Sequence, residues 1–129
     1  MFTLDQIKEA HSKVQSGADF PKYTQDLLDL GVSEYTIYVA DGHAEYKGKG
    51  DYTVPSEAEY KTLKVEPKVD ADRFKDCLKR HQQGKTDYYT FCKDSAETGI
   101  EKWIVNILAK TCTYFDKSGN FVLEEKIPI

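Results

Sequence analysis

His43 and Glu45 are the polar pair in this chain that is best placed for chemistry, because they lie two positions apart in a segment with strand-like alternation. Side chains two apart on a strand point to the same face of a sheet. A histidine titrates near neutral pH and can act as an acid or a base, and a carboxylate beside it can orient the ring. The spacing therefore suggests acid–base chemistry at His43, with Glu45 or Asp41 as the orienting group.

The same residues also fit a surface that binds a ligand or a protein partner. The Asp41-Gly42 pair is typical of a two-residue type I′ turn, which would place Ala40 opposite His43 and Tyr38 opposite Glu45. No nucleophile motif accompanies the histidine, so the pattern favours a binding surface or an ordinary solvated sheet face over an enzyme. The candidate ligand or partner face consists of Tyr38, Asp41, His43, Glu45 and Lys47.

The cysteines and the other two histidines could also do chemistry, but their positions favour packing in the core. Cys77, Cys92 and Cys112 are odd in number and form no CxxC pair, so neither a disulfide framework nor a zinc site is predicted. Cys92 could be a thiol nucleophile, but it falls on the apolar stripe of a helix, where burial makes a thiol inert. His11 and His81 also lie on apolar stripes and are predicted to pack. We expect no metal and no cofactor, since phosphate-loop and dinucleotide motifs are absent from the sequence.

The sequence predicts that these residues are positioned by one series of elements, two helices followed by three strands, which occurs twice along the chain. Apolar residues at helical spacing predict helices from Leu4 to Val14, with Gly17 as the stop, and from Asp19 to Gly31. Alternation of period two then predicts three strands, over residues 35–39, 43–46 and 51–54. The second series gives helices near 74–81 and 87–99, followed by strands over 103–107, 111–115 and 121–125. The segment 55–69 between the two series reads as a connector, with a possible strand at 63–65.

The two series also match residue by residue, at an offset of 68. Gly31 corresponds to Gly99, and Tyr35 to Trp103. We therefore expect an α+β fold built from an internally duplicated helix–helix–strand–strand–strand unit, with four helices covering one or two antiparallel sheets. A single domain over 1–129 is expected, with pseudo-repeats over about 3–54 and 70–127. The matched aromatic residues are predicted to pack in the core: Tyr23, Tyr35, Tyr46, Phe91, Trp103 and Tyr114.

Composition narrows the classes of partner. The 129 residues carry a formal net charge of −4, and no basic stripe is visible, which argues against nucleic acid and anionic membranes. No secretory signal or long apolar run is evident, so a cytoplasmic protein without a membrane span is expected. The sequence leaves a monomer and a homodimer equally open.

Six segments together resemble a known family: Met1–Ile7, Ser16–Phe20, Val39–His43, His81–Tyr88, Gly99–Trp103 and Thr111–Tyr114. They are similar to a family of bacterial and prophage-associated proteins, the YbcV/YdfO-like domain of unknown function 1398. The resemblance covers nearly the whole chain. It implies a stand-alone α+β protein, in a family sometimes labelled phage envelope proteins, and it brings no catalytic residues with it.

Two functions therefore stay open at this point. The first is a non-enzymatic binding or interaction module for a protein partner or a small molecule. Such a module would use either the groove between the two halves or the outward face of the first hairpin. The alternative is a small enzyme with acid–base chemistry at His43 and Glu45. The two halves differ at this site, because Thr111 and Thr113 occupy the positions that match His43 and Glu45.

Overall fold

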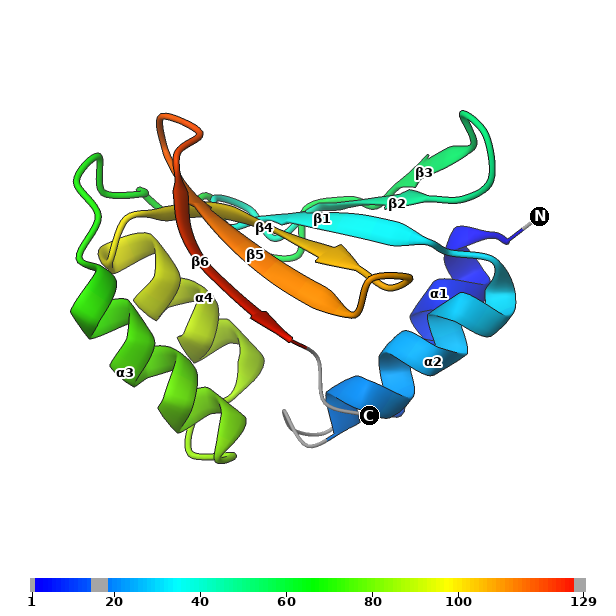
Figure 1. The fold of residues 1–129 in the computed structure, drawn as a ribbon, viewed down its shortest axis with the longest axis horizontal. Coiled ribbons are helices and arrows are strands. Elements are labelled where there is room, and N and C mark those ends of the chain that lie inside the picture. Colours follow the sequence, from blue (N-terminus) through cyan, green and yellow to red (C-terminus); the bar gives the residue numbers. More distant parts are fainter. Residues whose placement is uncertain (1, 15–18, 127–129) are drawn as a thin grey trace.

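The computed structural model describes residues 2–14 and 19–126. These residues form four helices and six strands, in the order helix–helix–strand–strand–strand repeated twice (Figure 1). The elements are α1 (Leu4–His11), α2 (Phe20–Leu30), β1 (Glu34–Tyr38), β2 (Ala44–Lys47), β3 (Thr53–Pro55), α3 (Ala71–Gln82), α4 (Tyr88–Glu97), β4 (Ile100–Asn106), β5 (Thr111–Asp116) and β6 (Phe121–Lys126). The predicted α+β class and the predicted order of elements are confirmed.

The six strands of the described part join in one antiparallel sheet, in the order β3-β2-β1-β4-β5-β6. The sequence did not determine this order. β1 and β4 form the middle pair, so the first and second halves of the chain meet side by side at the centre of the sheet. Thr36 lies opposite Ile104 across this pair, and these two residues match each other at the offset of 68. The central seam therefore places this one pair of equivalent positions directly against each other.

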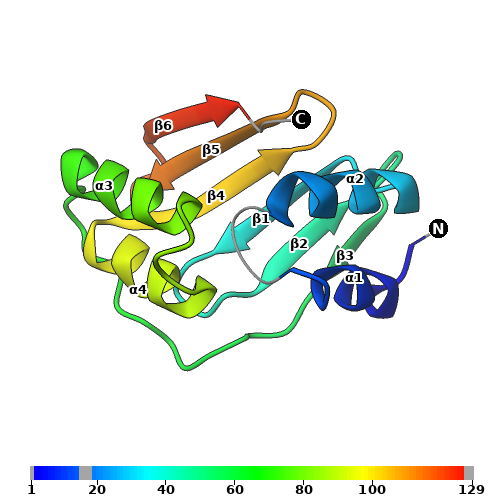
Figure 2. The same cartoon turned by 90° about the horizontal axis from the view of Figure 1, so that it is seen from below.

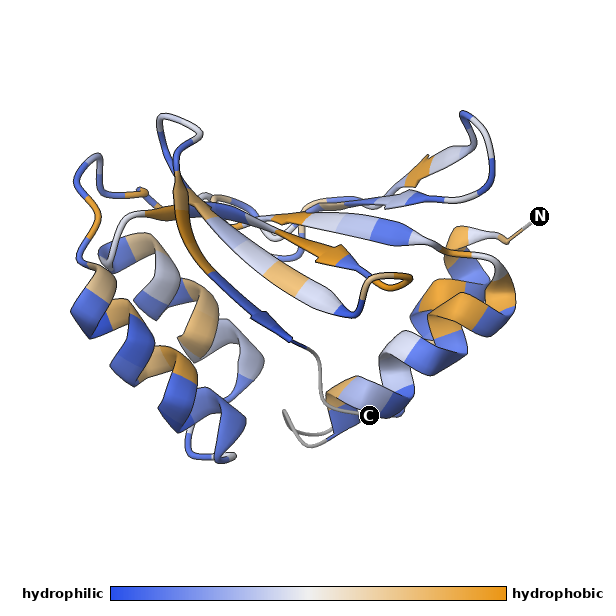
Figure 3. Cartoon of the chain, in the orientation of Figure 1, coloured by the Kyte–Doolittle hydropathy of each residue, from blue (hydrophilic) through white to orange (hydrophobic). Residues whose placement is uncertain are grey.

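Both pairs of helices lie on the same face of the sheet. Figure 1 shows α1 and α2 beneath one end of the sheet and α3 and α4 beneath the other, and the view from below in Figure 2 shows the same separation. The opposite face of the sheet carries no helix in the part of the chain that is described. α3 alternates hydrophilic and hydrophobic stretches in Figure 3, as an amphipathic helix against a sheet does. The middle of the helix-bearing face is thus left between two helical walls.

Capping residues fix where the helices begin and end. Asp87 accepts a hydrogen bond from the Thr90 backbone N–H at 2.8 Å and begins α4 as predicted. Gly31 ends α2 with φ of +104°, a left-handed conformation that a Cβ disfavours. Asp19 occupies the N-cap of α2 without a side-chain capping bond. The predicted extension of the first helix to Val14 is wrong, because α1 ends at His11 and a turn follows. The predicted stop at Gly17 lies outside the described residues.

The connector contains no strand, which corrects the prediction for Leu63-Lys64-Val65. Around the predicted strand, its backbone groups bond to a loop and to a helix end. The Leu63 N–H donates to the Ala40 carbonyl at 2.6 Å, and the Glu66 N–H donates to the Ala96 carbonyl at 2.9 Å. Val65 is nevertheless buried. The apolar residues that resembled a strand are explained by packing of an irregular segment against the core.

The turn between β1 and β2 also differs from the prediction. Tyr38 lies opposite His43, because the Tyr38 N–H donates to the His43 carbonyl at 3.0 Å, and residues 39–42 form the loop. A type I′ turn needs positive φ at both central residues, but in this loop only Gly42 has it. The register is therefore shifted by two positions from the expected one. A shift of two keeps every side chain on its predicted face, since side chains alternate with period two.

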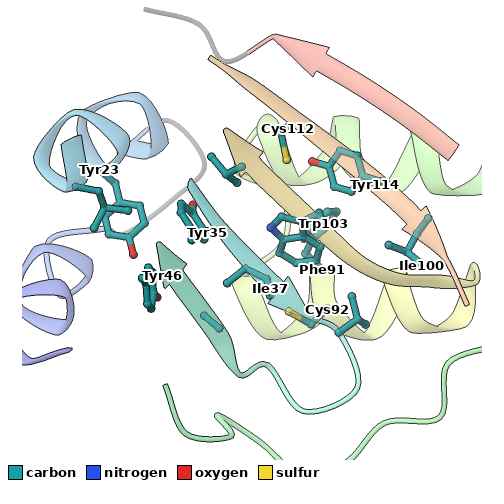
Figure 4. Packing of buried hydrophobic residues seen from close by; sticks show 14 of the residues in the cluster. Tyr23, Tyr35, Ile37, Tyr46, Phe91, Cys92, Ile100, Trp103, Cys112 and Tyr114 are labelled. Carbon is teal, nitrogen blue, oxygen red and sulfur yellow. The ribbon is translucent and has the colours of Figure 1, made fainter. Parts of the chain in front are cut away.

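Buried residues from both halves form one hydrophobic cluster, part of which Figure 4 shows. The six matched aromatic residues all belong to it, each less than 9% exposed, so their predicted burial is confirmed. The longest described helix, α3, has 12 residues, and none of the described helices combines the length and apolar character that crossing a bilayer requires.

Candidate functional site

A groove of about 630 Å³ lies on the helix-bearing face of the sheet. Its floor is formed by β1, β2, β4 and β5, and its walls come from all four helices and the connector. The two halves of the chain therefore contribute to one hollow. None of the five residues of the predicted hairpin face lines it.

Aromatic side chains from the two halves make up most of the floor. Tyr35 and Tyr46 face each other across β1 and β2, with ring centroids 5.4 Å apart. Trp103 and Tyr114 form the matching pair across β4 and β5, with centroids 5.9 Å apart. The offset of 68 relates the two pairs, and Figure 4 shows them as a row across the sheet. The residues predicted as core are thus buried and also form the surface of the groove.

Two polar atoms of the floor have no hydrogen-bond partner among the described residues. They are the hydroxyl of Tyr35 and the indole N–H of Trp103, on side chains that are 3% and 6% exposed. In the described part of the chain, no fully enclosed side-chain nitrogen or oxygen lacks a partner. Both atoms must therefore reach open space, and the groove is the space that both side chains line. Water can reach both atoms there, so a ligand with matching polar groups could replace that water and bond them directly.

Four of the phenols that line the groove are neutral at physiological pH. Burial raises the pKa of Tyr23, Tyr35 and Tyr114 far above the ordinary value of tyrosine, and it raises the pKa of Tyr46 as well. Tyr23 and Tyr46 share a side-chain hydrogen bond, and the Tyr23 hydroxyl points toward Tyr46 in Figure 4. The groove therefore offers hydroxyl groups and ring faces rather than phenolate charges.

A histidine lies against an aromatic ring in each wall. His81 is partly buried, as its predicted packing implies, whereas His11 is exposed. His11 meets Tyr23 edge-on, at a centroid distance of 5.4 Å. His81 stacks on Phe91, the residue that matches Tyr23, at 4.5 Å and an interplanar angle of 9°. The Nδ1 atom of His81 lies 3.2 Å from the Thr86 carbonyl. Burial lowers the pKa of His81, so the ring is uncharged at neutral pH.

The charges that line the groove are mainly negative. Glu59 from the connector, Asp87 from the start of α4 and Glu125 from β6 face a single lysine, Lys8 of α1. Glu125 accepts hydrogen bonds from Gln82, at 2.9 and 3.0 Å, and from the Tyr114 hydroxyl at 3.2 Å. None of the three carboxylates forms an ion pair with a described residue.

The thiols show the burial that the sequence predicted. Cys77, Cys92 and Cys112 are free and buried. Burial raises the pKa of all three, and that of Cys112 reaches about 12. Cys112 lines the groove, but a thiol with such a pKa is almost entirely protonated and a poor nucleophile.

The predicted hairpin face lies on the side of the sheet opposite the groove, and the structure brings three of its residues together. The Nδ1 atom of His43 is 2.5 Å from an oxygen of Asp41, and the ring of Tyr38 stacks on His43 at 4.4 Å. Burial raises the pKa of Asp41, but the hydrogen bonds from His43 outweigh it and hold this pKa below its ordinary value. Asp41, rather than Glu45, is therefore the carboxylate that orients the histidine.

The other two predicted residues lie farther along β2. Glu45 is opposite Thr36, and its charge adds to burial in raising the pKa of Tyr38. The Lys47 ammonium is 3.9 Å from the Glu34 carboxylate. These residues share one face as predicted, and about a third of the side-chain surface of both Asp41 and His43 is exposed.

The sequence pattern points to the groove between the halves as a possible location, but it does not single out the residues that line it. One signal was present, because the matched core positions carry four tyrosines and one tryptophan. Tyrosine and tryptophan bring a polar atom into a core, and such an atom needs a partner. Phenylalanine or leucine would fill a dry core without that requirement.

Among residues 2–14 and 19–126, no three His, Cys, Asp or Glu side chains come together in a way that could hold a metal ion. A family described as "protein of unknown function (DUF1398)" has a model that matches residues 8–126, which is nearly the whole chain. No curated protein matches the chain in sequence.

Proposed function

This chain belongs to that family of unknown function, DUF1398. From the groove described above, we propose that the protein binds a small, largely apolar molecule. The observation that carries the proposal is the pair of unpartnered polar atoms, on Tyr35 and Trp103, in an aromatic hollow of about 630 Å³. Pockets for small molecules fall between roughly 300 and 1,000 Å³ and combine apolar walls with a few polar groups.

The placement of the groove also supports this proposal. It lies between the two halves, at a junction where ligand sites commonly occur. The six matched aromatic residues all line it, so both halves supply the same kind of wall. The ligand that fits has flat or apolar surfaces for the rings. It also has an acceptor for the Trp103 N–H and a group that exchanges a hydrogen bond with the Tyr35 hydroxyl.

A second candidate is the hairpin face of Tyr38, Asp41, His43, Glu45 and Lys47. The 2.5 Å contact between Asp41 and His43 favours it, because an oriented histidine is a common acid–base group. A ligand, a protein partner or a reacting substrate would then contact the uncovered side of the sheet. This surface is more exposed than the groove floor and lines no described hollow, so we rank it second.

One titration separates the two candidates. A neutral apolar dye, Nile red, is added while the fluorescence of Trp103, the only tryptophan in the chain, is followed. We expect one dye per chain and a change in Trp103 emission. Ala44→Phe places a ring on the groove floor and should weaken binding by about tenfold or more, because interiors have little spare volume. His43→Ala on the opposite face should leave binding unchanged.

The outcomes are distinct provided that circular dichroism shows both variants folded. Failure of the wild-type protein to bind the dye would overturn the groove proposal. Native mass spectrometry of gently purified protein adds a second readout, since it detects any retained molecule. A retained molecule that is lost from His43→Ala but kept by Ala44→Phe would move the function to the hairpin face.

A further inference from the structure

The groove combines ring faces with an excess of negative charge, and this combination selects among apolar ligands. Resting on the proposed binding function, we propose that the ligand is a hydrophobic organic cation. Three carboxylates, those of Glu59, Asp87 and Glu125, line the groove against one ammonium group, that of Lys8. A cation that enters the groove gains attraction from this lining, whereas an anion is repelled.

Two of the three carboxylates are held in place without being neutralised. Asp87 is fixed by its capping bond to the Thr90 N–H, and Glu125 is fixed by Gln82 and Tyr114. These partners are uncharged, and no described lysine, arginine or histidine forms an ion pair with Glu59, Asp87 or Glu125. Three unpaired carboxylates around a single hollow leave its negative charge available to a ligand.

The aromatic floor supports the same sign of charge. The faces of tyrosine and tryptophan rings carry negative partial charge and attract ammonium and other organic cations, most strongly where water is excluded. Tyr35, Trp103 and Tyr114 are each less than 9% exposed, and all three line the groove. The hydroxyl groups of Tyr35 and Tyr114 stay neutral, which leaves the ring attraction and the carboxylates as the sources of selectivity.

Two ions of the same shape and opposite charge test this proposal. Tetraphenylphosphonium and tetraphenylborate are titrated separately into the full-length protein, and both calorimetry and Trp103 fluorescence follow binding. We expect the cation to bind about tenfold or more tightly than the anion, and we expect this preference to shrink as salt is added.

Matched variants then locate the charge. Glu59→Gln with Asp87→Asn removes two lining charges, and asparagine caps a helix about as well as aspartate, so α4 keeps its start. Asp51→Asn with Glu57→Gln makes the same changes at exposed positions outside the groove. The first pair should weaken binding of tetraphenylphosphonium about fivefold or more, and the control pair should change it less than twofold.

The results distinguish this inference from the function on which it rests. Equal affinity for the two ions, or an equal effect of the two double variants, would overturn the preference for cations. So would binding of Nile red without binding of the phosphonium ion. These outcomes leave the groove as a ligand site, whereas failure of the wild-type protein to bind Nile red would overturn the proposed function itself.

Discussion

His81 shows how a single side chain can serve the packing of the wall and still respond to pH. Its ring stacks on Phe91, and its Nδ1 atom is close to Thr86. Burial lowers its pKa, although the Thr86 carbonyl and the charges of Asp87 and Asp94 act in the opposite direction. The folded protein therefore binds this proton less readily than the unfolded chain does.

The stability of the protein should consequently fall as the solution is acidified. In the unfolded chain histidine takes up a proton near pH 6.5, while in the folded protein the uptake occurs at lower pH. The stabilisation by neutral His81 is complete above pH 6.5 and is lost as pH falls toward the folded pKa. His81→Phe keeps an aromatic ring against Phe91 and removes the titration. Urea unfolding at pH 7.5 and 5.5 should show a smaller loss for the variant. Equal losses would contradict this explanation.

At the residue scale, the sequence predicts which side chains are buried. It does not predict whether a buried polar atom has a hydrogen-bond partner. Spacing on a helix or strand shows which side chains face the core, so the buried state of Cys92 and Trp103 followed from their positions. Whether the Trp103 N–H has a partner depends on atoms brought in from other elements. Spacing along one element contains no information about those atoms. The groove floor was therefore predicted as core but not as a site.

At the scale of elements, the connector packs tightly against the backbone of the second half at Gly99. It follows α4 with φ of +88°, and a Cβ there would lie 2.7 Å from the Lys68 carbonyl oxygen. The neighbouring Thr98 carbonyl accepts a hydrogen bond from the Asp70 N–H at 2.9 Å. The connector is thus tied to the end of one helix just before it begins another.

Gly99→Ala should therefore be much more costly than the same change at Gly119. Gly119 has a φ of +85°, nearly the same as that of Gly99, but nothing lies within 4 Å of the position of its Cβ. Gly119→Ala should lower the free energy of unfolding by about 1 kcal/mol, the usual cost of left-handed backbone for alanine. Gly99→Ala adds a steric clash with backbone and should cost about 3 kcal/mol. Guanidinium unfolding measures both. If the two variants lost the same free energy of unfolding, the connector would have to move away from the new methyl group without destabilising the fold.

Element types were predicted from local patterns, but the details that depend on partners were not. The Asp41-Gly42 pair is a common two-residue turn, yet the chain uses a four-residue loop. The Glu59 N–H donates to the Asp41 carbonyl at 2.8 Å, and Gly42 lies against the ring of Tyr60. The connector therefore acts on this loop from a distant part of the sequence. Local turn preferences are weaker than such contacts.

At the scale of the whole molecule, the central seam relates the two halves. Thr36 and Ile104 face each other across β1 and β4 and match at the offset of 68, which is what a two-fold axis through this pair would produce. The seam supports the proposal that the chain arose by duplication and forms a single domain. The order of strands could not be predicted, because either half could have joined the other through a different edge.

The first half should not fold as a stable monomer when separated. A fragment of residues 1–69 would expose β1 as an unpaired edge and remove the α3 and α4 walls from the core. Circular dichroism and light scattering of this fragment should show either an unfolded chain or a dimer in which β1 pairs with a second copy. A folded monomer would contradict the single-domain proposal. The fragment of residues 70–129 makes the matching test for the second half.

The two outer strands, β3 and β6, have features that hinder pairing of the sheet edges with strands of another molecule. β3 has three residues and ends at Pro55, which has no N–H to donate to another strand. β6 is longer, but its last three described residues are Glu124, Glu125 and Lys126, all charged. Short edges, proline and charge are the features by which sheets resist polymerising into fibrils. The chain can therefore keep one face of its sheet uncovered at high concentration, because neither edge is a good template for another molecule.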